Sequence, residues 1–297
     1  MSSHLLSTQE REDIFTRFIV PHVAGKLKPK ERPTGIILGG QPGSGKSNFI
    51  NLLKKLNPDA IPINGDDMRH FHPHFTKVMA ENEEHAANMT QADCNEWIER
   101  LIDLTSNHKA DIIIEGTMRR PEVVLNTSKL LSERGYNTEA IAIAVPPEIS
   151  WVSTIYRFEL QKSVTGYGRF IKQEGHQASL TGVSPTLQAI FDSPDINRLS
   201  LYSRRGDEYL KEYDNHRNQD TWESSENPSE VFNRLISKEL SQKELTYTLR
   251  LLNESVRLAH GRNAEERYIE YLLELSKPIR ERLIDMHPEI KNEIKFK

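Results

Sequence analysis

A chain of 297 residues has room for one large domain or two small ones. Hydrophobic residues make up 36%, enough for a packed core, and the net charge of −4 argues against a protein that coats nucleic acid. No apolar run is long enough to cross a membrane, and the N-terminus lacks the apolar core of a signal peptide. A single cysteine, Cys94, excludes an internal disulfide and a Cys-rich zinc site. We therefore expect a cytoplasmic globular protein without a membrane or nucleic-acid partner.

The hydrophobic pattern predicts strands and helices in alternation. Residues 7–20 are expected to form a short helix, because Ser7 is a good N-cap and Glu10 stands three positions later; a basic linker follows over 26–33. The predicted strands are 35–40, 60–64, 111–116, 138–145 and 198–204, and the predicted helices between them are 46–56, 90–107, 121–134 and 147–162. Pro62 weakens the prediction of the second strand and indicates either a sheet edge or an irregularity there.

This alternation predicts an α/β fold in three layers, with a mostly parallel sheet of about five strands. Residues 1–33 would be an N-terminal helix and linker, 34–226 the core, and 227–297 a helical extension interrupted at Pro278 and Pro288. Within the core, residues 163–183 are rich in Gly, Ser, Thr and Gln, and we expect them to be a mobile lid.

A phosphate-binding loop joins the first strand to the next helix. The segment Gly40-Gln41-Pro42-Gly43-Ser44-Gly45-Lys46-Ser47 matches G-x-x-x-x-G-K-[ST] in the setting that this motif requires. Glycines let successive backbone N–H groups point at phosphate oxygens, and the helix N-terminus adds positive potential. Lys46 would reach the β- and γ-phosphates, and the Ser47 hydroxyl would ligate Mg²⁺. The sequence therefore predicts a P-loop kinase fold that binds ATP with Mg²⁺.

Acidic residues follow the second and third predicted strands, at the sheet edge where ligands bind in parallel α/β folds. Asp66 is the better candidate for a general base that takes the proton of an acceptor hydroxyl, whereas Asp67 could cap the next helix. Glu115 could hold a magnesium-bound water or hydrogen-bond the acceptor. The residues alone do not decide whether Asp66 and Asp67 act in catalysis or only at the helix start, or which of its two roles Glu115 has.

Histidines and arginines supply further candidates. His70, His72 and His74 alternate, but Pro73 breaks regular pairing and no fourth ligand is apparent, so a loop histidine touching substrate is favoured over zinc. Arg157 in the helix 147–162 and Arg169 in the predicted lid could clamp the transferred phosphate when the lid closes.

Taken together, these motifs resemble the zeta toxin family. The resemblance rests on G-G-Q-P-G-S-G-K-S, on G-D-x-x-R-x-x-H-P, on I-I-E-G-T-x-R, and on Arg157 followed by Arg169 and His176. It runs from about Thr34 to the strand near Arg204. Members are P-loop kinases of bacterial toxin–antitoxin systems, which use ATP and Mg²⁺ to phosphorylate the 3′-hydroxyl of UDP-N-acetylglucosamine, and an antitoxin protein blocks their ATP site.

The resemblance implies a role for each matching position. Lys46 would hold phosphates, Asp66 would be the general base, and Arg157 and Arg169 would stabilise the transition state. The nucleotide sugar would be contacted by Arg69, His72, Glu99, Glu115, Thr117 and Arg119.

This sequence departs from the family in two places: Gly166-Tyr167-Gly168-Arg169-Phe170 in the lid, and the bulky, basic Met118-Arg119-Arg120-Pro121. Both lie where the acceptor would be recognised, so they bear on the identity of the sugar and not on the type of reaction. An antibiotic or nucleoside kinase and a non-catalytic ATP-binding module remain alternatives, and the N-terminal helix could inhibit the site in cis in place of an antitoxin.

Overall fold

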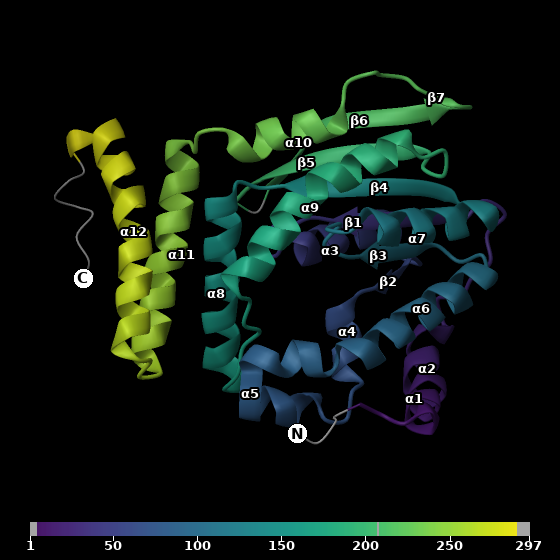
Figure 1. The fold of residues 1–297 in the computed structure, drawn as a ribbon, viewed down its shortest axis with the longest axis horizontal. Helices are drawn as coiled ribbons and strands as arrows, with labels where there is room; N and C mark the ends of the chain where they lie inside the picture. Colours follow the sequence, from purple (N-terminus) through teal and green to yellow (C-terminus); the bar gives the residue numbers. More distant parts are fainter. Residues whose placement is uncertain (1–4, 207, 290–297) are drawn as a thin grey trace.

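The computed structural model describes residues 5–206 and 208–289. Its centre is a seven-stranded sheet in the order β2-β3-β1-β4-β5-β6-β7 (Figure 1). The five strands β2, β3, β1, β4 and β5 are parallel, whereas β6 and β7 pair antiparallel. Strand bounds are β1 Thr34–Gly39, β2 Ile61–Ile63, β3 Ile112–Glu115, β4 Asn137–Ala144, β5 Arg198–Arg205, β6 Glu208–Asn218 and β7 Thr221–Trp222. The predicted α/β class is confirmed, and β2 lies at the edge, one of the two possibilities that Pro62 indicated.

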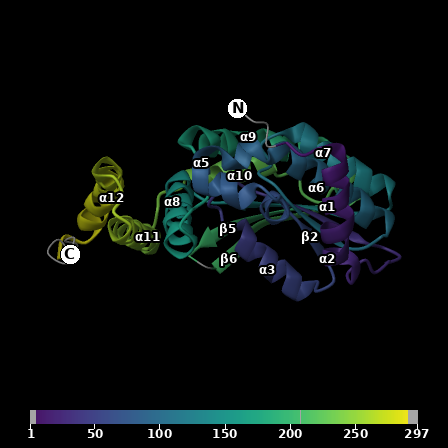
Figure 2. The ribbon, with the colours of Figure 1, turned by 90° about the horizontal axis from the view of Figure 1, so that it is seen from below.

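Helices cover both faces of the sheet, which gives three layers (Figure 2). Strand β4 shows why: its alanines at 140, 142 and 144 pack with α7, α9 and α10, while Ile141 and Ile143 pack with α3 and α11. The helices of the core are α3 Lys46–Leu56, α4 Gly65–His70, α5 Phe75–Met89, α6 Gln91–Asn107, α7 Pro121–Glu133, α8 Pro147–Thr165, α9 Gln173–Asp192 and α10 Pro228–Ser237.

The N-terminal segment packs on the β2–β3 edge of the core. Ser7 and Glu10 form the predicted capping box, and the helix continues through α1 Thr8–Ile14, the π-helical turn η1 Phe15–Ile19 and α2 Val20–Ala24. Phe15 and Ile19 are buried against Trp97 of α6. The helix therefore runs four residues beyond the predicted end.

Two features of the second half of the core differ from what the sequence indicated. Of the expected lid, only 166–172 lies outside helices: residues 163–165 end α8 and 173–183 begin α9. At least one of the glycines in this stretch has a packing role: Gly182 lets α9 approach the turn before α7, and a Cβ there would lie 2.3 Å from the backbone oxygen of Arg119. The sequence did not indicate β6, because this strand is mostly exposed and polar and only Tyr213 and Asn215 in it are buried.

Two long helices complete the chain: α11 Gln242–Gly261 packs on α8, and α12 Glu266–Met286 packs on α11 (Figure 1). Pro278 does not interrupt α12, because Ser276, Ile279 and Leu283 around it are buried and this packing holds the helix together across one missing hydrogen bond. Pro288 lies just beyond the helix end. Within the described ranges, no helix is both long and apolar enough to span a bilayer.

Candidate active site

The P-loop has the geometry that its glycines predict. Gly40, Gly43 and Gly45 have φ angles of +142°, +79° and +96°, which L-residues with side chains rarely adopt. At Gly43 the space is closed as well, because a Cβ would lie 1.9 Å from the backbone oxygen of Ser150 in α8. The loop thus runs against α8 and enters α3 with its N–H groups at the helix N-terminus, a setting suited to phosphate.

A buried polar chain fixes the first half of this loop. Gln41 Nε2 donates to the backbone oxygen of Val145 at 2.6 Å and approaches Ser150 Oγ at 3.3 Å. Ser150 Oγ in turn lies 2.9 Å from His176 Nε2 of α9. Burial, and next the nearby Lys46 charge, lower the pKa of His176, so its imidazole is neutral at pH 7. Sequence reasoning assigned no task to Ser150; its signal was only its place at the start of α8.

Lys46 is folded over the loop. Its Nζ donates to the backbone oxygens of Gly40 at 2.7 Å and Gln41 at 3.1 Å. Burial lowers its pKa to about 8, although the charge of Glu115 acts in the opposite direction. Ser47, one residue on in α3, is exposed.

Asp66 lies at the start of α4, across from the loop. One carboxylate oxygen accepts from Arg69 Nη1 at 2.8 Å, and the other pairs with Arg169 Nη1. Burial would raise its pKa, but the positive charges of Arg169, Arg69, Arg157 and Lys46 outweigh it and hold the pKa below the usual range. The side chain is 47% exposed, so the ionised carboxylate is open to a second molecule. Asn64, not Asp67, is the N-cap of α4.

Arg157 has the most unusual surroundings in the site. Among the described residues its Nε and Nη2 have no hydrogen-bond partner although both atoms are buried. Burial, and then the charge of Arg169, lower its pKa to about 10. An unpaired buried guanidinium costs several kcal/mol unless an anion completes it, so the geometry fits an oxyanion ligand beside Lys46.

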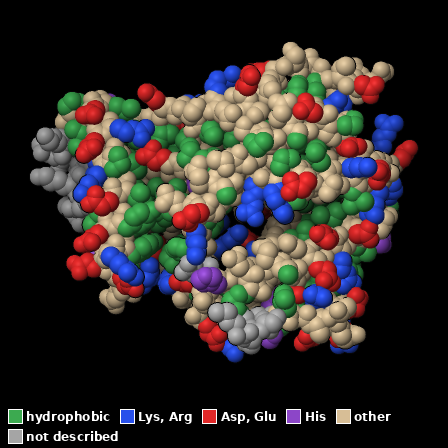
Figure 3. Space-filling model, viewed as in Figure 1, with side chains coloured by type: hydrophobic (Ala, Val, Ile, Leu, Met, Phe, Trp, Pro, Cys, Tyr) green, Lys and Arg blue, Asp and Glu red, His purple; other side chains and the backbone are tan. Residues whose placement is uncertain are grey.

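Glu115 ends β3 between these cations. Burial raises its pKa, and the Asp66 carboxylate adds to the effect, while Lys46 opposes it. The site therefore gathers four cations, Lys46, Arg69, Arg157 and Arg169, against the two carboxylates of Asp66 and Glu115. In Figure 3, Lys and Arg side chains surround a hollow in the middle of one face.

The structure does not bring every predicted residue into this site. The His72 side chain is wholly enclosed and lies 3.1 Å from the Asp93 carboxylate, so the expectation that it touches substrate needs correction. Glu99 is exposed on α6, two turns beyond Gln91, the residue that bonds Arg69. No described hydrogen bond or ion pair joins it to the site. No three His, Cys, Asp or Glu side chains of the described residues are grouped to hold a metal ion.

Thr117 and Arg119 follow β3 on a strained turn. Met118 between them has φ +51° and a buried side chain that fills the space above Gly39, where a Cβ would lie 2.1 Å from Met118 Cγ. Arg119 is exposed and Thr117 is half-buried. The bulky departure noted in the sequence thus packs beneath the site through Met118 and leaves Arg119 at the surface.

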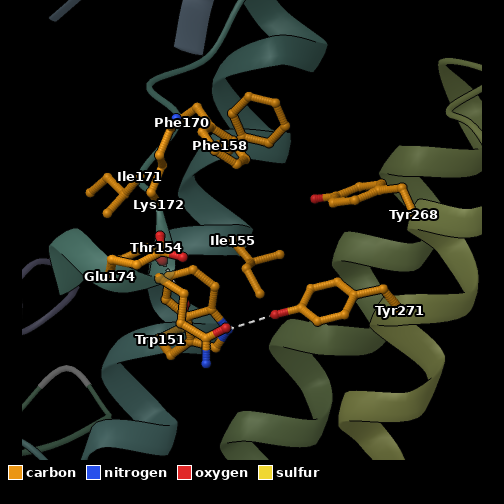
Figure 4. Close-up of a pocket in the computed structure, with 11 residues that line it drawn as sticks. Trp151, Thr154, Ile155, Phe158, Phe170, Ile171, Lys172, Glu174, Tyr268 and Tyr271 are labelled. Carbon is orange, nitrogen blue, oxygen red and sulfur yellow. Dashed lines mark hydrogen bonds between the residues drawn. The ribbon is translucent and has the colours of Figure 1, made fainter. Parts of the chain in front are cut away.

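A separate groove of about 400 Å³ lies along α8, between the segment 170–174 and α12. Figure 4 shows its aromatic walls, with Trp151, Phe158 and Phe170 on one side and Tyr268 and Tyr271 on the other. Trp151 Nε1 donates to the Tyr271 hydroxyl at 2.9 Å across it. Lys46, Asp66 and Arg157 do not line this groove, so it is not the site described above.

Comparison with known proteins agrees with the motifs. The sequence model of the zeta toxin family matches residues 22–218. Similar proteins include toxin zeta of Enterococcus hirae, which is 27% identical over 86% of this chain and 87% of that protein. Toxin PezT of Streptococcus pneumoniae is also 27% identical, over 73% of this chain and 83% of that protein.

Solved structures show the same fold. A structure from the PezAT toxin–antitoxin system of Streptococcus pneumoniae superposes with a TM-score of 0.72 at 24% identity, covering 86% of this chain and 100% of that one. The AvrRxo1-ORF1:-ORF2 complex superposes with a TM-score of 0.55 at 14% identity, covering 90% and 89%. Because the family's sequence model spans about two thirds of the chain, this protein belongs to the zeta toxin family, a family of kinase-type toxins.

Proposed function

We propose that the protein is an ATP- and Mg²⁺-dependent kinase that phosphorylates a hydroxyl group of a UDP-sugar, with the 3′-hydroxyl of UDP-N-acetylglucosamine as the first candidate. Family membership supports phosphoryl transfer in general. The observation that carries the proposal is the buried Arg157 guanidinium, whose Nε and Nη2 have no hydrogen-bond partner among the described residues and which lies near the charges of Lys46 and Asp66.

The residues present suit a triphosphate with Mg²⁺. The backbone N–H groups of the P-loop, Lys46 and Arg157 would bind phosphate oxygens, and the buried Ser44 hydroxyl, which also lacks a partner among the described residues, would donate to one of them. Ser47 would ligate the cation and Glu115 would hold one of its waters. When bound, ATP supplies the phosphoryl group and Mg²⁺ neutralises its charge.

Asp66 is proposed as the general base. Its lowered pKa keeps it ionised at neutral pH, and each carboxylate oxygen retains a lone pair after pairing with Arg69 or Arg169. Asp66 would take the proton of the acceptor hydroxyl while that oxygen bonds to the γ-phosphorus and the bond to the ADP oxygen breaks. Arg157 and Arg169 would hold the equatorial oxygens, and the half-buried Thr117 and the exposed Arg119 would contact the nucleotide sugar.

A separate antitoxin is proposed as the partner. The relatives are named as toxins, and the PezAT structure comes from a toxin–antitoxin system. Inhibition in cis by the N-terminal helix is less favoured, because α1, η1 and α2 pack through Phe15 and Ile19 on α6 and the β2–β3 edge. We place the reaction in the cytoplasm, where UDP-sugars are available.

Phosphorus NMR of the protein with ATP, Mg²⁺ and a panel of nucleotide sugars, free sugars, aminoglycosides and nucleosides tests the proposal. We expect a new phosphomonoester resonance in the samples that contain a UDP-sugar, and none in the samples that contain any other acceptor. Transfer to a nucleoside or an antibiotic would show that the acceptor belongs to that class and not to the UDP-sugars. ATP binding without transfer to any acceptor would refute the proposed kinase activity.

A further inference from the structure

The segment that carries Arg169 is anchored residue by residue. Tyr167 packs with Val78 and Met79 of α5, and Phe170 packs edge-on against Phe158 of α8 with ring centroids 5.7 Å apart. Between them, the Gly168 N–H donates to Glu83 Oε2 at 3.1 Å, and the Arg169 N–H donates to Gln161 Oε1 at 2.9 Å. This is the stretch whose sequence departs from the family pattern, and the structure gives each of its residues a contact.

Glu83 stands at the centre of these anchors. It belongs to α5, while its two carboxylate oxygens bind two other elements: one pairs with Lys162 of α8 and the other accepts from Gly168. The side chains of Glu83 and Lys162 are 24% and 23% exposed, so the pair is largely withdrawn from water and gains more than a surface pair would. We refer to Glu83, Lys162 and Gly168 as the latch.

Local backbone geometry sets the latch in place. Helix α5 is broken at Asn82, with φ −156° and ψ 72°, so Glu83 starts its second part. Gly168 has to be glycine, because a Cβ would lie 2.5 Å from the backbone oxygen of Phe158. The segment therefore lies directly on α8 with its N–H turned to α5.

We propose that Glu83 is a positioning residue for phosphoryl transfer, which rests on the function proposed above. It touches none of the groups assigned to the reaction. It ties α5, which follows the Asp66 helix on the acceptor side, to the segment that brings Arg169 to the phosphate side. The two halves of the site are consequently held together, and the position of Arg169 depends on the position of α5 as well as on its contacts with α8.

The variants Glu83→Ala and Glu83→Gln test this inference, with Glu81→Ala as the control. Glu81 is an exposed acid on the same helix, and its ion pair within the described part of the chain is with Lys77 at 3.9 Å. Glu83→Ala should lower kcat about tenfold or more, because small displacements of a transition-state cation are costly, and should leave KM for ATP nearly unchanged. Glu83→Gln keeps an oxygen that can accept the hydrogen bond from the Gly168 N–H, so its kcat should fall less than that of Glu83→Ala. Glu81→Ala should behave like the wild type.

Two measurements distinguish a role of Glu83 in positioning Arg169 from a general effect on the stability of the fold. In an Arg169→Ala background, Glu83→Ala should cause no further loss of kcat, since it acts through that arginine. Hydrogen exchange of peptides covering 163–172 should be faster in Glu83→Ala and unchanged in Glu81→Ala.

Unchanged exchange in Glu83→Ala, or an equal loss of kcat with and without Arg169, would overturn the inference. So would faster exchange with an unchanged kcat. A wild-type protein that transfers phosphate to no acceptor would instead refute the proposed function, and the exchange comparison would then decide alone whether Glu83 holds the segment.

Discussion

Replacing Lys46 by methionine should reveal how much stability the P-loop gives up to keep a buried ammonium. Methionine fills a similar volume without a charge. Lys46 releases its proton at a pKa of about 8 in the folded protein, against 10.5 for an ordinary lysine, and burial is the main cause. Its two backbone acceptors, Gly40 and Gln41, offset only part of this cost.

The size of the effect follows from the two pKa values. Each pKa unit corresponds to about 1.4 kcal/mol, so the difference amounts to about 3 kcal/mol. Below pH 8 both the folded and the unfolded chain carry the proton, and the folded state bears the full cost. Between pH 8 and 10.5 the unfolded chain holds more protons, so the free energy of unfolding of the wild type should rise with pH relative to Lys46→Met.

Urea unfolding of both proteins without nucleotide, at intervals from pH 7 to pH 10, measures this difference. We expect Lys46→Met to be the more stable protein at pH 7 and its advantage to shrink by most of that 3 kcal/mol by pH 10. Lys55→Met, which removes an exposed lysine of the same helix, is the control. A difference that does not change with pH would refute the desolvation argument.

Three further results are expected. Gly43→Ala should abolish ATP binding, measured by calorimetry, because its Cβ would lie 1.9 Å from the backbone oxygen of Ser150. Gly25→Ala is the control and should bind ATP normally, because a Cβ at that position has no atom within 4 Å. Arg157→Ala should lower kcat about 10³-fold in steady-state assays, as loss of a transition-state arginine does, and a tenfold loss or less would remove it from that role. In the wild type, kcat/KM for ATP should fall as pH rises through about 8, where the free enzyme loses the Lys46 proton, and a flat profile to pH 10 would contradict the assigned pKa.

The parts of the site that are contiguous in sequence were predictable. The P-loop is a short motif in which each residue type follows from phosphate binding, and the parallel sheet explains why Asp66, just after β2, and Glu115, at the end of β3, lie at the same sheet edge. The five parallel strands were found because buried strands read as continuous apolar runs, as Ile112–Ile114 do. Strand β6 has no such run.

Contacts between residues that are far apart in the sequence could not be predicted from it. His72 stands in a loop-like, polar stretch, yet Asp93 and Trp97 enclose it, and only the packing of α6 reveals this. Gly182 looks like a flexible residue, yet it is the point where α9 packs closely against the backbone of Arg119 in the turn before α7. Glu83 lies in an ordinary run of acids, and its task depends on a segment 85 positions away.

The central claim is that Asp66 takes the proton of an acceptor hydroxyl while the P-loop holds the phosphate donor. The most direct measurement compares single-turnover transfer from γ-labelled ATP to UDP-N-acetylglucosamine by the wild type and by Asp66→Asn, with ATP affinity measured for both. We expect the variant to bind ATP and to transfer the label at least about 100-fold more slowly, the range in which a general base contributes. Transfer at the wild-type rate by a folded Asp66→Asn protein would contradict it.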